Sequence, residues 1–208
     1  MSFIVIKKIK KLGFNLIPCL IQRIYYSLLR LVFHFERWHA KSPYSCHQYK
    51  KKCVEVIKEV VSPLSVIEIG CGLGEILRRI PSPRRIGIDI DRQVINAANY
   101  ITRNQSNIQF YTGTFIQIEK MVTGKLDLLI MINFVHSIEP DELKLSLERL
   151  FLKVDIRWLL VDEIIEKDNH RIKHKFSKIL PEIFVEHSRF IDDVNVREVI
   201  LYRKIAQN

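Results

Sequence analysis

Three closely spaced glycines follow an apolar run in the first half of the chain. The segment VIEIGCGLGEIL, residues 66–77, places Gly70, Gly72 and Gly74 at alternate positions, with Glu68 just before them. The chain of 208 residues has seven glycines, so three within five positions indicate a functional loop. Glycine permits a tight turn and lets a ligand approach the main chain, and a following helix would offer free N–H groups. The pattern is typical of a loop that holds an anion or a nucleotide.

The spacing excludes the usual dinucleotide fingerprint. G-x-G-x-x-G would require glycine at position 75, which is Glu75, and a carboxylate there would oppose a pyrophosphate. A second acidic residue, Asp89, ends the strand-like run RIGIDID, 19 residues after Gly70. A carboxylate at the tip of a neighbouring strand can accept hydrogen bonds from both hydroxyls of a ribose.

With these residues the chain resembles the class I S-adenosylmethionine-dependent methyltransferases over about residues 50–203. The resemblance implies S-adenosyl-L-methionine as the cofactor, with Glu68 toward its ammonium side and Asp89 on its ribose. The family usually carries Gly-Asp after the third strand, where the acid meets the adenine amine. Here the text is YTGTF, so Thr114 stands in that place, and Phe115 could cover the ring. The Gly-rich turn that often precedes strand five is replaced by LKVDIRWLL.

Candidate acceptor-side residues follow strands four and five. The crevice of an open parallel sheet lies at the carboxyl ends of its strands, and MINFVHSIEPDEL should deliver Asn133 and His136 there. We expect Asn133 near the cofactor and His136 and Glu163 as catalytic groups, since an imidazole can take a proton from an acceptor hydroxyl. The alternatives are that His136 bonds to the backbone of its loop, and that Glu163 is a solvated strand end.

The segment RWHAKSPYSCHQYK, residues 37–50, precedes the predicted domain and is expected to lie across the cofactor as a lid. It supplies His39 as a third catalytic candidate, beside Trp38. The spacing of His39, Cys46 and Cys53 matches no familiar zinc pattern. Methyl transfer by direct displacement needs no metal, and we expect none.

Alternating short apolar runs and helix-like stretches indicate the fold class. Strand-like runs lie at residues 65–69, 85–90, 107–112, 126–132 and 157–163, with helices expected near 73–80, 91–103, 141–153 and 168–180. Asp91 and Asp141 are the expected N-caps of the second and third of these helices. Two closing runs, 183–191 and 196–203, must pair antiparallel because few residues join them. We therefore predict an α/β fold: a doubly wound, mostly parallel, seven-stranded sheet with a C-terminal antiparallel hairpin, preceded by N-terminal amphipathic helices.

Positive charge is concentrated at the N-terminus. Residues 1–60 carry 12 Lys and Arg against 3 Asp and Glu, a net charge of +9, whereas residues 61–208 carry 21 against 20. Arg23, Arg30 and Arg37 recur every seven residues along one helical face, and another face holds aliphatic residues: Ile17, Ile21, Ile24, Leu28 and Leu31. This pattern is typical of a helix in an anionic membrane interface, with docking on the domain or on a dimer partner as the alternative. We divide the chain into a basic N-terminal segment and lid, 1–49, and a methyltransferase domain, 50–208, and expect residues 1–36 to be dispensable for its fold.

The remaining features bear on compartment and function. The four cysteines suggest no disulfide framework, no signal peptide is evident, and the longest uncharged N-terminal run is too short to span a bilayer, so we expect a cytoplasmic protein, peripheral on the inner membrane face. The predicted function is O-methylation of a small molecule, glycan or lipid-linked precursor near the membrane surface. An RNA-directed methyltransferase that uses the basic segment is an alternative, although its large aliphatic residues argue against it. A non-catalytic cofactor-binding protein is a third reading, suggested by Thr114.

Overall fold

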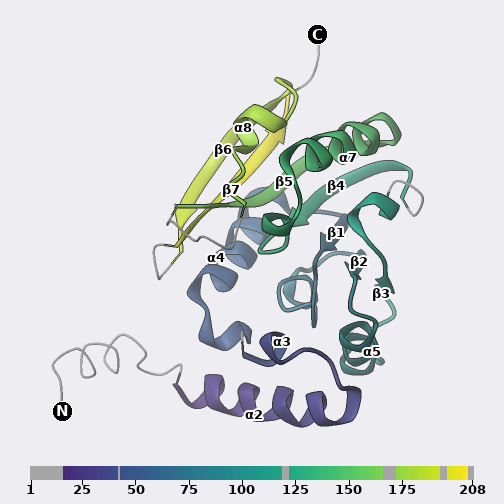
Figure 1. Cartoon of the computed structure of the whole chain (residues 1–208), viewed down its shortest axis with the longest axis vertical. Helices are drawn as coiled ribbons and strands as arrows, with labels where there is room; N and C mark the ends of the chain where they lie inside the picture. Colours follow the sequence, from purple (N-terminus) through teal and green to yellow (C-terminus); the bar gives the residue numbers. More distant parts are fainter. Residues whose placement is uncertain (1–15, 42, 119–121, 166–171, 193–195, 206–208) are drawn as a thin grey trace, which may run out of the picture.

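The protein is built on one seven-stranded sheet. The computed structural model describes residues 16–41, 43–118, 122–165, 172–192 and 196–205 (Figure 1). The strand order is β3-β2-β1-β4-β5-β7-β6, with the first five strands parallel and with β7 antiparallel to both of its neighbours. The strands are β1 (Ser65–Ile69), β2 (Arg84–Asp89), β3 (Ile108–Thr112), β4 (Gly124–Met131), β5 (Val154–Ile164), β6 (Phe184–Ile191) and β7 (Arg197–Lys204). The predicted fold class, including the terminal hairpin, is confirmed.

Both faces of the sheet are buried because side chains alternate across it. Val66 and its β4 partner Leu128 belong to one apolar cluster, whereas the next pair, Ile67 and Leu129, belongs to the other. The first cluster includes residues of α2 (Leu16–Phe33), α4 (Gln48–Val56) and α5 (Arg92–Ile101). The second includes residues of α7 (Pro140–Lys153) and α8 (Phe176–Ile179). The two helical layers leave the carboxyl ends of the parallel strands to be covered by loops.

Several helix boundaries differ from the expected ones. Asp91 caps α5 as predicted, accepting hydrogen bonds from the backbone of the first turn. The helix expected at 73–80 is instead a series of turns that ends in a 3-10 turn, η4 (Leu77–Arg79), because the glycines before it adopt left-handed angles. The helix α7 begins at Pro140, a residue suited to the first helical position, so its N-cap is Glu139 and not Asp141.

The C-terminal helix is also shorter than expected. Residues 168–171 lie outside the described part, Ile172 is not helical, and α8 spans only Phe176–Ile179. The Ile172 N–H donates instead to the carbonyl of His136 at 2.9 Å. This hydrogen bond to a residue distant in the sequence takes the place of the intrahelical hydrogen bond that the sequence periodicity had suggested for Ile172.

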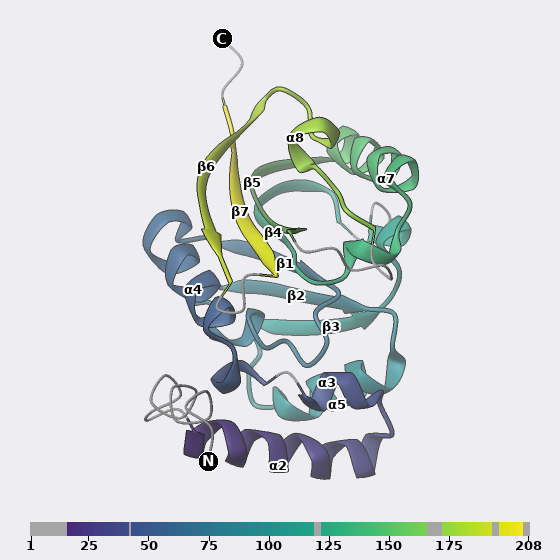
Figure 2. The same ribbon diagram turned by 60° about the vertical axis from the view of Figure 1, so that its left-hand side comes forward.

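The helix α2 lies along the outside of the molecule, next to α3 (Arg37–Lys41) and α5 (Figure 2). Tyr26 and Leu29 are buried against the domain, and Cys19 forms a disulfide with Cys46 in the short 3-10 turn η2 (Tyr44–Cys46). The expectation that the cysteines form no disulfide is wrong for this pair, which lies 27 residues apart in a sequence without a recognisable spacing motif. The helix is also long and apolar enough to cross a membrane by length and composition.

Candidate active site

The glycine loop has the geometry that its sequence predicts. Gly70, Gly72 and Gly74 have φ angles of 66°, 52° and 66°, in the left-handed region that favours glycine. A Cβ at Gly74 would lie 2.6 Å from the ring of Phe110, and one at Gly72 would lie 3.0 Å from His39 Nδ1. The bare side of Gly72 therefore faces His39 of α3, so a side chain there would first displace this imidazole. The loop lies between the sheet and α3.

Asp89 ties the tip of β2 to this loop. Its carboxylate accepts hydrogen bonds from the Gly72 N–H at 2.8 Å and from the Asp91 N–H at 3.0 Å. Burial raises the pKa of Asp89 above its usual value, and these backbone bonds oppose the shift. Its lone pairs are not exhausted by two donors, so the carboxylate can accept further hydrogen bonds from a ligand.

Glu68 lies beneath the loop in a dry environment. It accepts a hydrogen bond from the Leu77 N–H at 3.1 Å. Burial raises the pKa of Glu68 to about 8, against the opposing effects of the Leu77 N–H and the Lys50 ammonium. A cation that reached this carboxylate would favour its ionised form.

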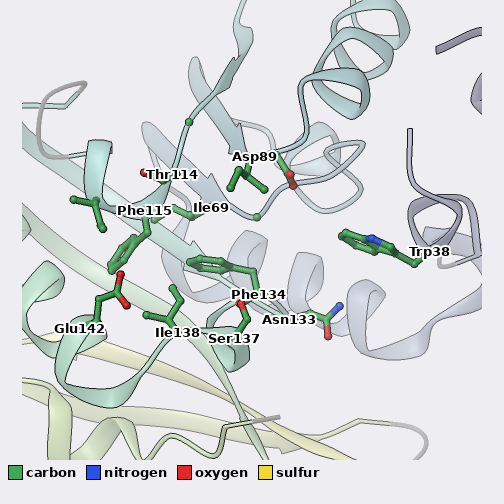
Figure 3. Close-up of a pocket in the computed structure, with 14 residues that line it drawn as sticks. Trp38, Ile69, Asp89, Thr114, Phe115, Asn133, Phe134, Ser137, Ile138 and Glu142 are labelled. Carbon is green, nitrogen blue, oxygen red and sulfur yellow. The ribbon is translucent and has the colours of Figure 1, made fainter. Parts of the chain in front are cut away.

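Two adjoining cavities run along the loop (Figure 3). The larger has a volume of about 420 Å³ and the smaller about 60 Å³, and Trp38, Gly70 and Asn133 line both. Figure 3 shows Trp38 on the opposite side of the larger cavity from Phe115 and Glu142. The smaller cavity reaches Glu68, so the pair extends from a buried carboxylate to an apolar chamber.

The structure brings most of the predicted cofactor residues to these cavities. Asp89, Thr114 and Phe115 line the larger one, and Glu68 and Gly72 line the smaller one. Gly74 does not line either cavity and instead packs against Phe110. Seven of the eight predicted cofactor residues therefore line a cavity, and Gly74 is the exception.

Asn133 connects the cavities to the C-terminal hairpin. It has a φ angle of 63°, which asparagine tolerates better than most residues. Its N–H donates to Asp162 at 2.9 Å, and its side-chain oxygen accepts from Arg197 at 2.8 Å. These bonds explain how a loop that follows β4 holds a strained conformation at the cavity wall.

His39 is the catalytic candidate that reaches a cavity. Its ring stacks on Trp38 with centroids 3.4 Å apart, and its Nε2 lies 3.6 Å from Asp91. Burial lowers the pKa of His39 to about 4, although Asp91 opposes the shift. The imidazole is therefore neutral at pH 7 and packs against the glycine loop.

His136 belongs to a buried ion-pair cluster outside the cavity linings. Its Nε2 lies 3.3 Å from Asp162, which also accepts a hydrogen bond from Arg197 at 2.9 Å. Burial alone would raise the pKa of Asp162, but His136 and Arg197 hold it below its ordinary value. The Nδ1 of His136 lies 3.3 Å from the Ile172 carbonyl oxygen. This geometry matches the alternative in which His136 is structural.

Glu163 is also placed away from both cavities. Its carboxylate accepts hydrogen bonds from the Phe176 N–H at 2.8 Å and from Lys175 at 3.1 Å, so it holds the start of α8. His136 and Glu163 were expected to be catalytic groups at the cofactor site, but neither side chain lines either cavity. Their partners come from distant elements that local spacing could not reveal.

Other cavity residues had not been selected from the sequence. They are Ile69, Ile90, Gly113, Ile116, Phe134, Ser137, Ile138 and Glu142 in the larger cavity, and Lys50, Cys71, Leu73, Glu75, Ile76 and Ile132 in the smaller one. The signal for two of them was available, because Ile90 directly follows Asp89 and Phe134 directly follows Asn133. Among the described residues, no group of three His, Cys, Asp or Glu side chains could hold a metal ion.

Comparisons with known proteins identify the fold. No family model and no curated protein matches the sequence. The N-methyltransferase NodS from Bradyrhizobium japonicum WM9, solved with S-adenosyl-L-homocysteine, matches with a TM-score of 0.67 at 14% identity, over 87% of this chain and 98% of that one. The magnesium protoporphyrin IX methyltransferase ChlM from Synechocystis PCC 6803, also solved with this product, matches with a TM-score of 0.63 at 17% identity, over 76% and 83%.

A third match is a putative O-methyltransferase from Nostoc punctiforme PCC 73102, with a TM-score of 0.57 at 16% identity, over 75% of this chain and 56% of that one. At these identities the shared property is the fold. The chain has the fold of the class I S-adenosylmethionine-dependent methyltransferases, as its glycine loop and strand pattern had indicated.

Proposed function

We propose that the protein is an S-adenosylmethionine-dependent methyltransferase. The observation that carries the proposal is the hydrogen bond from the Gly72 N–H to Asp89, which sets a carboxylate beside a left-handed glycine loop in the wall of a cavity of about 420 Å³. The site lies at the carboxyl ends of β1, β2 and β4, where open α/β sheets bind ligands.

The residues present fit this cofactor. Asp89 can accept from ribose hydroxyls, and Glu68 can accept from an ammonium group. Apolar side chains suited to a flat purine face the larger cavity: Ile90, Phe115, Phe134 and Ile138. Thr114 offers a hydroxyl where related proteins carry an acid. When bound, the cofactor supplies a methyl group already activated by a sulfonium.

The chain itself must orient the acceptor and exclude water. Trp38 is half exposed at the cavity mouth and is held by its stacking on His39, so the pair can close over a bound acceptor. We propose His39 as the group that accepts a hydrogen bond or a proton from an acceptor hydroxyl. A histidine pKa near 4 makes it a weak base, which favours an acceptor whose proton leaves with the methyl transfer and not before it.

The proposed acceptor is a small molecule, a glycan or a lipid-linked precursor, methylated at oxygen. The structural neighbours differ in this respect, because one is named for magnesium protoporphyrin, one as an N-methyltransferase and one as a putative O-methyltransferase.

The proposed location is the cytoplasm, peripheral on the inner membrane face. The exposed apolar face of α2 and its arginines support it. The Cys19–Cys46 disulfide is the observation against a reducing compartment, where such bonds are rare. The state of this bond in the cell is measured by quenching the protein in acid and counting its free thiols by alkylation. Four free thiols indicate a reduced protein, and two indicate that the Cys19–Cys46 bond persists in the cell.

Two other functions stay open to test. An RNA-directed enzyme is favoured by the grouping of Arg23, Arg30 and Arg37 on one groove, although aliphatic residues border it. A non-catalytic cofactor-binding protein is favoured by Thr114 in place of an acid. Incubating cell extract with labelled cofactor and then fractionating RNA, lipid and small molecules distinguishes all three.

Calorimetry with S-adenosylmethionine tests the central proposal. Asp89→Ala should weaken binding at least tenfold, because a hydrogen bond to a charged acceptor contributes roughly 1.5–3 kcal/mol. Asp155→Ala is the matched control, since this exposed carboxylate pairs with Lys204 far from the cavities. Wild-type protein that binds neither the cofactor nor S-adenosylhomocysteine would refute the proposal.

A further inference from the structure

A second concave site, distinct from the cavities along the glycine loop, lies between α2 and α3. This cationic groove has a volume of about 470 Å³ and is lined by Arg23, Ser27, Arg30, Leu31, Arg37, Ala40 and Lys41. It therefore gathers the three arginines that recur every seven residues, together with a lysine. Within the described ranges none of the four cations forms an ion pair with an acidic side chain, and α2 contains no acidic residue.

One atom in the groove is buried without a partner. The Nε of Arg30 is inaccessible to solvent and has no hydrogen-bond partner among the described residues. An inaccessible Nε is out of reach of a ligand in the groove, so it is the four cations without acidic partners that suit the groove to an oxyanion. Arginine binds phosphate oxygens particularly well because its planar fork can donate two parallel hydrogen bonds.

An apolar surface borders the groove. The outward side of α2 exposes large apolar side chains over its whole length: Leu16, Ile17, Leu20, Ile21, Ile24, Tyr25, Leu28, Leu31 and Val32. Ile17 and Leu31 are 72% and 67% exposed, and no described element lies beyond α2 in either Figure 1 or Figure 2. Soluble proteins rarely expose a continuous aliphatic strip of this length.

The combination selects one occupant. An aliphatic strip beside unpaired arginines complements a bilayer, where acyl chains lie next to phosphate groups. An RNA backbone would satisfy the arginines and leave the strip in water. The occupant we argue for is therefore the anionic membrane surface, with a lipid phosphate in the cationic groove.

The helix α3 connects this groove to the candidate active site. Arg37, Ala40 and Lys41 follow the i, i+3, i+4 spacing of one helical side and line the groove. Trp38, elsewhere on the same helix, lines both cavities, and His39 lines the smaller one and packs against Gly72. A phosphate held by Arg37 and Lys41 would restrain the helix that carries the lid.

We propose that α2 and the cationic groove dock on an anionic bilayer, and that docking orders α3 and thereby tightens cofactor binding. The coupling part deepens the proposed methyltransferase function and rests on it, whereas the docking part does not. Coupling between two binding sites is reciprocal, so the cofactor must strengthen vesicle binding by the same factor.

The docking test uses the full chain and two kinds of vesicle, pure phosphatidylcholine and phosphatidylcholine with about 30% phosphatidylglycerol. We expect flotation with the anionic vesicles only, weakened by high salt. Arg23→Glu/Arg30→Glu should abolish it. The control Lys125→Glu/Arg157→Glu makes the same charge change in a groove on β4 and β5 and should retain most of it.

The apolar contribution is tested in the same way. Ile17→Ser/Ile21→Ser should weaken flotation at least tenfold, whereas Leu152→Ser, on the exposed side of α7, should not change it. Equal loss in both charge variants would show that net charge and not this groove is responsible. Failure of the wild type to float, or salt-sensitive binding to single-stranded RNA in its place, would overturn the docking proposal.

The coupling test measures cofactor affinity with and without saturating vesicles. We expect about fivefold or tighter binding on anionic vesicles, no change with neutral ones, and no gain in Arg37→Glu/Lys41→Glu. Equal affinity with and without anionic vesicles would overturn the coupling and leave the docking result intact. Absence of cofactor binding in every condition would instead refute the methyltransferase proposal, so the two failures are distinguishable.

Discussion

Two carboxylates near the ends of neighbouring strands have different electrostatic roles at the residue scale. Asp89 is held by two backbone N–H groups beside the larger cavity, whereas Glu68 has one backbone donor and a pKa raised to about 8 by burial. At neutral pH Glu68 is therefore mostly protonated before a ligand arrives. A ligand that carries an ammonium group must displace this proton in order to gain an ion pair.

Cofactor binding should accordingly depend on pH through Glu68. A cation beside the carboxylate lowers its pKa, so binding at pH 7 should release most of a proton, and affinity should rise from pH 6 to 8 and then fall as the ligand's own amino group loses its proton. Calorimetry in buffers of different ionisation enthalpy measures the proton count. Glu68→Gln is the matched variant, because it retains the shape and leaves only the titration of the ligand's own amino group.

The opposite trend would contradict this role. Affinity that falls between pH 6 and 8 in the wild type, or a proton count that is the same in Glu68→Gln, would remove Glu68 from the ligand site. The nearby Lys50, Glu75 and Asp89 also influence the pKa of Glu68, so each profile is compared with that of the variant.

Site residues whose roles depend on neighbouring sequence could be predicted, whereas those whose roles depend on distant elements could not. Glu68, the glycine loop and Asp89 were identified because their roles follow from strand ends and backbone angles within one βαβ-like unit. His136 could not be placed, because its environment is created by Asp162 on β5 and Arg197 on β7. The same holds for Glu163, whose partners lie on α8 and just before it.

At the scale of elements, α2 shows how one helix serves two surfaces. Its inner side buries Tyr26 and Leu29, and Tyr26 and Gln22 bond to Glu75, which immediately follows the glycine loop. Its outer side is aliphatic and exposed. The recurrence of an arginine every seven residues was recognisable in the sequence. The sequence could not distinguish contact with a membrane from docking on the domain, because both use an amphipathic helix. The structure contains the docking contact and leaves the outer side available.

Substitutions of two adjacent leucines test the buried and the exposed sides of α2 separately. Leu29 is 6% exposed and Leu28 is 56% exposed. Leu29→Ala should lower the free energy of unfolding by about 2–5 kcal/mol, as expected for a buried leucine, with little effect on vesicle binding. Leu28→Ala should change stability by less than about 0.5 kcal/mol and weaken vesicle binding. Denaturant unfolding and vesicle flotation of the two variants check both outcomes.

Equal destabilisation by Leu28→Ala and Leu29→Ala would mean that another surface covers the outer side of α2, as in a dimer. A concentration-dependent melting temperature would then identify the second copy. Neither outcome is compatible with a bare apolar face that waits for a bilayer.

At the scale of the whole molecule, the helix α2 is packed into the domain that carries the sheet. The sheet order and the two apolar layers were predictable, because alternation of strands and helices fixes a doubly wound fold. The dispensability expected of residues 1–36 is not supported. Its removal would take Tyr26, Leu29 and Phe35 from the core, break the Cys19–Cys46 bond and leave Glu75 without its α2 partners.

Two truncations test this integration. Deleting residues 1–36 should lower the free energy of unfolding by several kcal/mol, since each large buried side chain contributes roughly 1.5–3 kcal/mol and a domain is stable by only about 5–15 kcal/mol. Deleting residues 1–15 retains every contact described for α2 and should therefore lower the free energy of unfolding by less than the longer deletion does. It should still weaken binding to anionic vesicles, because the segment carries the four lysines of KKIKK, each contributing about 1 kcal/mol near such a surface. Thermal unfolding followed by circular dichroism, with flotation alongside, separates the two effects. A 1–36 deletion that melts like the full chain would show that α2 is an appendage, and the coupling between membrane and lid would lose its mechanical basis.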